Sequence, residues 1–212
     1  MKTIILSLFL TVCASSASAQ AVAGKSRFST FYELFRPGIV HLANGKATRH
    51  PQLNIFLRNG RLLFRKGTTV MQADMETISR VDFSDAHFVK VDSAMAEVID
   101  TVGTCRLLRT TLIDMDAYRT QLINNREITD IGFGDQISFT AIDPTSEEAL
   151  LYPLVNFYYF DLGKDIIRVN ERSVSHALPK DKRRIMRTIM SDAAFSWSSP
   201  AYLKQLLELF PQ

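Results

Sequence analysis

The sequence has few cysteines and, beyond its N-terminus, no long run of apolar residues. Cys13 and Cys105 are the only thiols among 212 residues, which excludes the dense disulfide framework of small secreted domains. A membrane-spanning helix needs about 20 consecutive apolar residues, and no later segment reaches that length. The fold must therefore be stabilised by an ordinary hydrophobic core, which a chain of this size can build.

A strong excess of either charge is also missing. The chain carries 25 Lys and Arg against 22 Asp and Glu, which gives a formal net charge of +3. Domains that bind nucleic acid through their overall field are more basic than this. We therefore expect no nucleic-acid partner, and any electrostatic recognition must come from a local cluster of charges.

The N-terminus has the pattern of a secretory signal peptide. Lys2 is followed by the apolar stretch Ile4–Val12 and then by small residues that end in Ala17-Ser18-Ala19. A basic start, a short apolar core and a small-residue tail direct export and cleavage. The prediction is a signal peptide over residues 1–19, cut between Ala19 and Gln20.

Cys13 directly follows this apolar core, where a lipoprotein signal would place its lipid-modified cysteine. Such signals have a small residue before the cysteine, whereas this chain has Val12. The pattern favours a soluble exported protein, periplasmic or extracellular, over one anchored through Cys13. Cleavage would leave Cys105 as the single thiol, so no intramolecular disulfide is expected.

Short runs rich in apolar and β-branched residues, separated by turn residues, dominate residues 20–212. This spacing predicts one mainly β (α+β) domain, either a curved antiparallel sheet or a partly closed barrel, rather than alternating strands and helices. The expected strands are Gly38–Ala43, Leu53–Arg58, Arg61–Phe64, Ile78–Phe83, His87–Val91, Val98–Thr101, Arg106–Ile113, Ile137–Ile142, Val155–Phe160 and Ile166–Val169.

Three hairpins are predicted from turn residues. Asn44-Gly45 and Asn59-Gly60 each suit a two-residue type I′ turn, and residues 161–164 join the last two strands. A two-residue turn at Asn59-Gly60 also fixes which residues face each other across the ribbon. The pairs expected there are Leu57 with Leu62, Ile55 with Phe64, Phe56 with Leu63, and Arg58 with Arg61.

Helices are expected mainly at the C-terminal end, over about residues 178–211. Pro179 can open a helix with an apolar stripe formed by Ile185, Met186, Ile189 and Met190. Ser199 and Pro200 suit the start of a second amphipathic helix, and Phe195 and Trp197 between them are expected to enter the same core. A further helix over residues 116–124, capped by Asp116, interrupts the strands.

Motifs that would name a reaction are lacking. The four histidines, His41, His50, His87 and His176, form no HExxH pattern, and no GxSxG occurs. Asp114 with Asp116, and Asp161 with Asp165, lack the order of ligands that a calcium loop requires and suit turns and caps. Gly132-Phe133-Gly134 is too short for a phosphate loop. We expect no metal and no cofactor.

The most asymmetric feature is a basic cluster. Such clusters meet acidic lipid headgroups, polyanionic glycans or acidic protein surfaces, although many are simply solvated helix faces. We take this cluster as the candidate interaction patch: Lys180, Lys182, Arg183, Arg184 and Arg187.

Several segments together resemble small exported proteins of Bacteroidota-type bacteria. The resemblance covers most of the chain after the signal, implies export and a single β-rich domain with C-terminal helices, and carries over no functional residue. The segments are Gly38-Ile39-Val40 leading to Asn44-Gly45, Leu53-Asn54 with the hairpin to Phe64, the basic helix from Lys180, and the closing stretch Tyr202-Leu203-Lys204-Gln205-Leu206-Leu207.

Two functions of different class follow. The first is a non-enzymatic binding or interaction module of the cell envelope, whose partner would be an envelope protein, an anionic glycan or a lipid surface. The second is a small hydrolase or transferase that uses Cys105 or a pair of carboxylates. The enzyme would gather Cys or His with carboxylates in a deep pocket, whereas the binding module would not.

Overall fold

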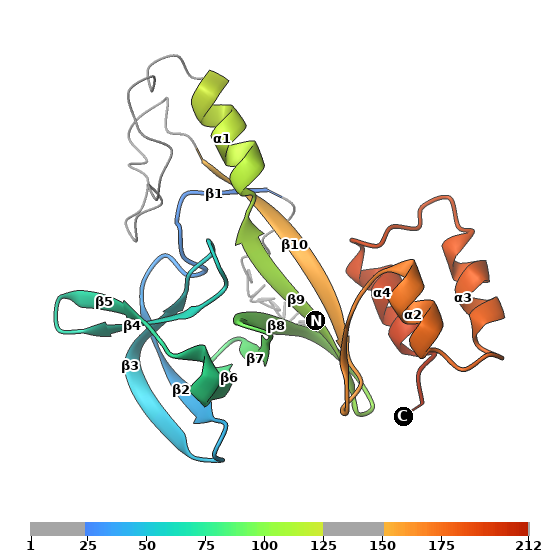
Figure 1. Cartoon of the computed structure of the whole chain (residues 1–212), viewed down its shortest axis with the longest axis horizontal. Coiled ribbons are helices and arrows are strands. Elements are labelled where there is room, and N and C mark those ends of the chain that lie inside the picture. Colours follow the sequence, from blue (N-terminus) through green and yellow to red (C-terminus); the bar gives the residue numbers. More distant parts are fainter. Residues whose placement is uncertain (1–23, 125–150, 212) are drawn as a thin grey trace, which may run out of the picture.

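The computed structural model describes residues 24–124 and 151–211 (Figure 1). Over these ranges the chain forms one antiparallel sheet of eleven strands, so the expectation of a mainly β fold is confirmed. The expected strand Ile137–Ile142, the predicted signal peptide and Gly132-Phe133-Gly134 lie outside the described residues. The strands are β1 Lys25–Ser26, β2 Arg36–Leu42, β3 Ala47–Ile55, β4 Leu62–Lys66, β5 Thr69–Gln72, β6 Ile78–Asp82, β7 His87–Val91, β8 Ala94–Val102, β9 Cys105–Ile113, β10 Tyr152–Asp161 and β11 Ile166–Arg168.

The sheet is a nearly continuous meander. Its strand order is β1-β10-β9-β8-β7-β6-β2-β3-β4-β5, and β11 pairs with the other end of the same edge of β10 that β1 pairs with. The predicted hairpin between β10 and β11 is confirmed, with Phe160 opposite Ile167. Aromatic side chains alternate along β10, because Tyr158 and Phe160 enter one buried cluster while Tyr159 packs against another.

The sheet curls but does not close into a barrel. The turn between β3 and β4 reaches across to strands that are distant in the sheet order. The Ile113 N–H donates to the Leu57 carbonyl at 2.7 Å, and the Met95 N–H donates to the Gly60 carbonyl at 2.8 Å. These two bonds hold the curl around a buried cluster, called here the N-terminal cluster: Leu53, Ile55, Leu62, Met75, Ile78, Val81, Phe83, Phe88 and Met95.

The predicted register of this β3–β4 hairpin is wrong by two residues. Ile55 faces Leu62, so the four residues from Leu57 to Gly60 form the loop. The cause is non-local, because the Leu57 N–H donates to the Ser29 carbonyl at 2.9 Å. A shift of two residues keeps every side chain on its face. The pairs predicted for Leu57 with Leu62, Ile55 with Phe64, Phe56 with Leu63 and Arg58 with Arg61 do not form as expected.

The turn at Asn44-Gly45 also differs from the prediction, although the hairpin itself forms. Gly45 has a φ of 82°, whereas Asn44 is not among the described residues with positive φ. A type I′ turn needs positive φ at both central positions. Instead, the Leu42 N–H donates to the Lys46 carbonyl at 2.8 Å, which leaves a three-residue loop. The Asn44 Oδ1 accepts the Lys46 N–H at 3.1 Å and stabilises it.

Two helices of the C-terminal segment were expected and are present, α3 (Arg183–Met190) and α4 (Pro200–Leu207). The first begins later than predicted, because Pro179 lies in a turn whose carbonyl accepts the Lys182 N–H at 3.1 Å. Another helix, α2 (Glu171–Ala177), was not predicted. Asn170 caps it by accepting the Ser173 N–H at 2.9 Å.

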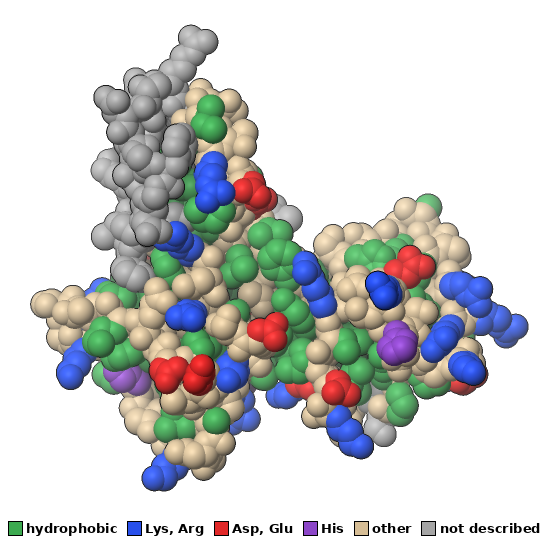
Figure 2. Space-filling view, viewed as in Figure 1, with side chains coloured by type: hydrophobic (Ala, Val, Ile, Leu, Met, Phe, Trp, Pro, Cys, Tyr) green, Lys and Arg blue, Asp and Glu red, His purple; other side chains and the backbone are tan. Residues whose placement is uncertain are grey.

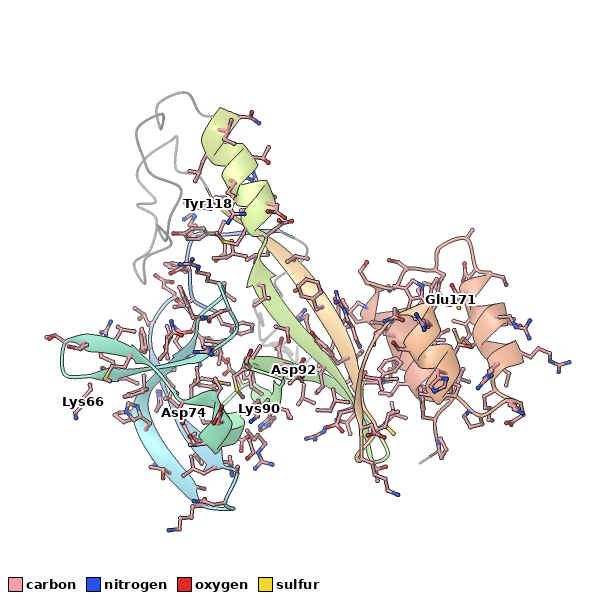
Figure 3. All side chains as sticks on the ribbon, in the orientation of Figure 1. Lys66, Asp74, Lys90, Asp92, Tyr118 and Glu171 are labelled. Carbon is pink, nitrogen blue, oxygen red and sulfur yellow. The ribbon has the colours of Figure 1, made fainter. Side chains whose placement is uncertain are left out.

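The helix expected near residue 116 is confirmed as α1 (Met115–Asn124). Its cap is Asp114 rather than Asp116. The Asp114 Oδ1 accepts the N–H groups of Asp116 at 3.1 Å and Ala117 at 2.9 Å. Tyr118 of α1 lies against Tyr152 with a ring-centroid distance of 5.1 Å (Figure 3). In the described ranges, helices are too short or too polar to cross a membrane.

Helices α2 to α4 pack together beside the far end of β8, β9 and β10 (Figure 1). Phe195 and Trp197 pack against this core as predicted. Ile185 does not, because its side chain is 43% exposed while Met186 of the same stripe is buried. The C-terminal cluster consists of Cys105, Leu107, Tyr158, Phe160, Val174, Leu178, Met186, Leu203, Leu206, Leu207 and Phe210.

Candidate functional site

The basic cluster lies on the turn before α3 and on α3 itself. Lys180, Arg184 and Arg187 are exposed, whereas Lys182 and Arg183 are half-buried. The half-buried Arg183 has a structural contact, because its Nε donates to the Leu178 carbonyl at 3.3 Å. The space-filling view shows several cationic side chains on this outer end of the molecule (Figure 2).

Helix α2 adds to this face a cation that sequence reasoning missed. Arg172 lines a shallow hollow of about 460 Å³ together with Ser175, His176 and Arg183. Its acidic member is Glu171, which lies on α2 (Figure 3). The name cationic face is used below for Arg172, Lys180, Lys182, Arg183, Arg184 and Arg187. The missed signal was the i, i+4 spacing of Arg172 and His176, which places both on one side of a helix.

The cationic face is electrostatically unneutralised within the part of the chain that the structure describes. None of its side chains makes a salt bridge to a described carboxylate, whereas Lys204 of the neighbouring α4 pairs with Asp100 at 3.0 Å. Glu171 and Asp181 are the acidic groups close to it in sequence. Like charges held close together raise the local potential and attract anions. This arrangement can bind a polyanion without rearranging existing ion pairs.

Cys105 lies in the C-terminal cluster, and its surroundings are those of a structural thiol. The side chain is 2% exposed, and its Sγ donates to the Pro211 carbonyl at 3.8 Å. Among the described residues, no histidine makes a hydrogen bond to it. A nucleophilic thiol needs access and a base. This geometry gives no support to a reaction at Cys105.

Asp161 and Asp165, two of the acidic residues considered from the sequence, make structural contacts in the turn between β10 and β11. Asp161 is buried and accepts hydrogen bonds from the Arg106 Nε at 2.9 Å and from the Gly163 N–H at 2.9 Å. The Asp165 carbonyl accepts the Leu162 N–H at 2.9 Å, which closes the β10–β11 turn. The structure therefore gives the Asp161 carboxylate a role in a turn and in an ion pair, whereas Asp165 contributes its backbone carbonyl to the same turn.

One polar cluster joins residues that lie far apart in the sequence. The Asp82 carboxylate lies 2.7 Å from the His41 Nε2 and 2.9 Å from the His87 Nδ1. The Arg80 Nη2 lies 3.0 Å from the same carboxylate. No sequence signal pairs His41 with Asp82, because β2 and β6 become neighbours only through the sheet order. Across the described ranges, no group of three His, Cys, Asp or Glu is arranged to hold a metal.

The electrostatics of this cluster favour an ionised Asp82. Burial raises the pKa of the carboxyl group, but hydrogen bonds with His87 and His41 and the charge of Arg80 outweigh it. The net result is a pKa below the usual value for aspartate. The cluster therefore links the three neighbouring strands β2, β6 and β7 through one charged group, which is a structural role.

A second hollow lies where the outer edge of β10 meets the segment between α3 and α4. It measures about 490 Å³ and has a mixed aromatic and polar lining. The sequence placed Phe195 and Trp197 in the core, but both remain partly accessible. The name aromatic cleft is used below for this hollow, whose lining residues are Asn156, Phe157, Tyr158, Arg168, Val169, Phe195, Ser196, Trp197 and Ser198.

Comparison with known proteins yielded no matching family model, no similar curated protein and no similar solved structure.

Proposed function

We propose that this protein is an exported, non-enzymatic binding module of the cell envelope, which holds an anionic glycan on its cationic face. The supporting observation is a set of cations on α2, on α3 and on the turn before α3 that make no salt bridge to a described carboxylate, two of which, Arg172 and Arg183, line a hollow. A repeating acidic polymer offers carboxylates or sulfates at intervals, so several such cations engage at once. Multiple weak contacts on one chain then add to a useful affinity.

A glycan suits this face better than a lipid surface does. A helix that lies in a membrane interface inserts an apolar face between the lipids. The apolar side of α3 is already used, because Met186 is buried and Ile189 and Met190 pack against the C-terminal cluster. Ile185 is the exposed large apolar side chain on α3. One such side chain contributes roughly 1.5 to 3 kcal/mol when fully buried, which is too little to hold a domain on a bilayer.

Export is part of the proposal and rests on the sequence. The predicted signal peptide over residues 1–19 would release a chain that begins at Gln20, in the periplasm or outside the cell. Intact-mass spectrometry of the native product tests this directly. A mass that begins at Gln20 supports release, whereas an intact Met1 or a lipidated species that begins at Cys13 contradicts it.

The glycan proposal is tested by charge reversal at the exposed cations. The variant Lys180→Glu, Arg184→Glu, Arg187→Glu leaves Arg183 in place, because Arg183 caps the end of α2 through the Leu178 carbonyl. The control variant is Lys46→Glu, Arg49→Glu, Lys66→Glu, which changes the formal charge equally on exposed residues of the distant β2–β5 region (Figure 3). Both are compared with the original protein on immobilised polygalacturonate and heparin.

The expected result is that the α3 variant elutes at clearly lower salt than the original protein, while the control elutes close to it. Screening by salt acts on both variants alike, so a difference reports where the polymer binds. Equal loss in the two variants would mean that only net charge matters, and the proposed site would be wrong. Retention by phosphatidylglycerol vesicles but not by either glycan would also contradict the proposal and favour a lipid surface.

A further inference from the structure

The aromatic cleft is built around the single tryptophan of the chain. Trp197 lies edge-to-face against Phe195 with a centroid distance of 5.1 Å, and Phe195 lies edge-to-face against Tyr202 at 5.5 Å. Both Phe195 and Trp197 belong to the irregular segment between α3 and α4 rather than to a helix or strand. A large aromatic side chain that packs against the core on one side and stays partly accessible on the other can also serve as a platform for a ligand that has one apolar side.

The segment that carries Trp197 is stabilised by hydrogen bonds within itself and to Tyr202. The Tyr202 hydroxyl donates to the Asp192 carboxylate at 2.6 Å, and the Asp192 carboxylate also accepts the Ala194 N–H at 2.9 Å. The Ser198 N–H donates to the Ser196 Oγ at 3.2 Å. When a binding surface is already ordered, little conformational entropy is lost on ligand binding. The cleft is therefore prepared for binding rather than formed by it.

The polar members of the cleft come from the sheet. The Arg168 guanidinium lies over the Phe157 ring, 4.8 Å from its centroid, and makes no salt bridge to a carboxylate in the described residues. The Asn156 Oδ1 accepts the Thr111 hydroxyl at 2.7 Å. This contact fixes the amide group and leaves its N–H₂ as a donor. The cleft thus has an exposed cation at its rim, an amide donor and serine hydroxyls, and its lining among the described residues contains no carboxylate.

This combination suits one class of ligand. A sugar ring has an apolar face of C–H groups and a rim of hydroxyls, so it stacks on an indole while its rim meets amide, hydroxyl and guanidinium groups. A flat apolar ligand would leave the polar rim of the cleft unpaired, which costs free energy. A carboxylate on the sugar would meet Arg168, because arginine pairs with carboxylates through two parallel hydrogen bonds.

We infer that the aromatic cleft is a saccharide-binding site that takes one pyranose ring on Trp197 and favours an acidic sugar through Arg168. This site is separate from the cationic face, and its ligand contacts do not include Lys180, Arg184 or Arg187. Short oligosaccharides, which are too small to span several cations, should bind here even if the polymer proposal fails.

The test uses two probes, trigalacturonic acid and maltotriose, with the full mature chain. Because Trp197 is the only tryptophan, its fluorescence reports the cleft without background, and calorimetry measures the variants that lack it. Saturable binding with a stronger response to the acidic trimer is expected. Trp197→Ala should weaken both probes about tenfold, which corresponds to roughly 1.4 kcal/mol, and Arg168→Ala should remove the preference for the acidic probe.

Matched variants keep the test decisive. Arg49→Ala removes an exposed arginine elsewhere in the sheet and should leave both affinities unchanged. Trp197→Phe keeps an aromatic face if Trp197→Ala does not fold, and a severalfold loss is expected from the smaller ring. The variant reversed at Lys180, Arg184 and Arg187 should bind the trimers as the original protein does, which separates this site from the proposed function. The inference would be overturned if neither probe showed saturable binding, or if the affinities were unchanged in both Trp197→Ala and Arg168→Ala.

Discussion

The contact between Gly60 and Ala94 provides the sharpest test of the curled sheet. Gly60 has a φ of 71° in the β3–β4 turn, and a Cβ added to it would lie 2.6 Å from the Ala94 Cβ and 3.5 Å from Leu112. The same glycine accepts the Met95 N–H at 2.8 Å. Gly60→Ala should therefore displace the turn from β8 and weaken the hydrogen bond between the Met95 N–H and the Gly60 carbonyl, which stabilises the curled sheet.

Gly45 is the matched control, because it has a φ of 82° and nothing within 4 Å of an added Cβ. An alanine in this left-handed conformation costs roughly 1 to 2 kcal/mol at either position. Overpacking of a well-filled region adds about 1 to 3 kcal/mol, and this applies only at Gly60. We expect Gly60→Ala to lower the free energy of unfolding by about 1 to 3 kcal/mol more than Gly45→Ala does.

Urea unfolding followed by circular dichroism measures both variants against the original protein. The difference should appear in the midpoint with little change in slope. Adding Ala94→Gly to Gly60→Ala removes the clashing Cβ, and the double variant should regain most of the extra loss, as coupled neighbours do. Equal losses for Gly60→Ala and Gly45→Ala would refute the argument that this turn is held against β8.

Two further predictions concern charged groups. The pKa of Asp82 is lowered in the folded protein, so its ionised form stabilises the fold at neutral pH, and this stabilisation is lost as pH falls from the unfolded pKa of 3.8 through the folded pKa. Asp82→Asn should therefore be less stable than the original protein at pH 7. Thermal unfolding measured in steps down to about pH 2 should show the unfolding temperatures of the two proteins converging. Asp161→Asn leaves the half-exposed Arg106 without its carboxylate, so we expect a loss of about 2 to 4 kcal/mol in urea unfolding, less than for a fully buried pair; an unchanged midpoint would contradict the role given to this pair.

The fold was predictable from the sequence where local signals decided the outcome. His87–Val91 was expected and observed with the same bounds, because its turn residues and alternating pattern are unambiguous. The register of the β3–β4 hairpin was not predictable, because it depends on Leu57 bonding to Ser29 and Ile113. Turn preferences of about 1 kcal/mol or less cannot outweigh several backbone hydrogen bonds to distant strands.

The candidate sites show the same division. The basic cluster was visible as a run of charges. Arg184 and Arg187 lie on the exposed side of α3, where an amphipathic helix would place them, whereas Lys180 lies in the turn before it. Arg172 joined it only because α2 packs beside α3. The aromatic cleft could not be foreseen, since Arg168 and Trp197 line one hollow only through the path of the chain between β11 and α4. Aromatic residues in a sequence more often indicate core than ligand contact.

The two largest buried clusters differ in how they can assemble. Members of the N-terminal cluster all lie between Leu53 and Met95, so that region can collapse while the rest of the polypeptide is still emerging. The C-terminal cluster must wait, because Leu107 and Phe160 are covered by side chains as late as Phe210. Until the last helix has been synthesised, the apolar surface of β9 and β10 is exposed to solvent and prone to aggregation. A chaperone that binds the nascent chain is therefore expected to bind this apolar surface. Slower synthesis of the final helices should lengthen the time for which the chaperone stays bound.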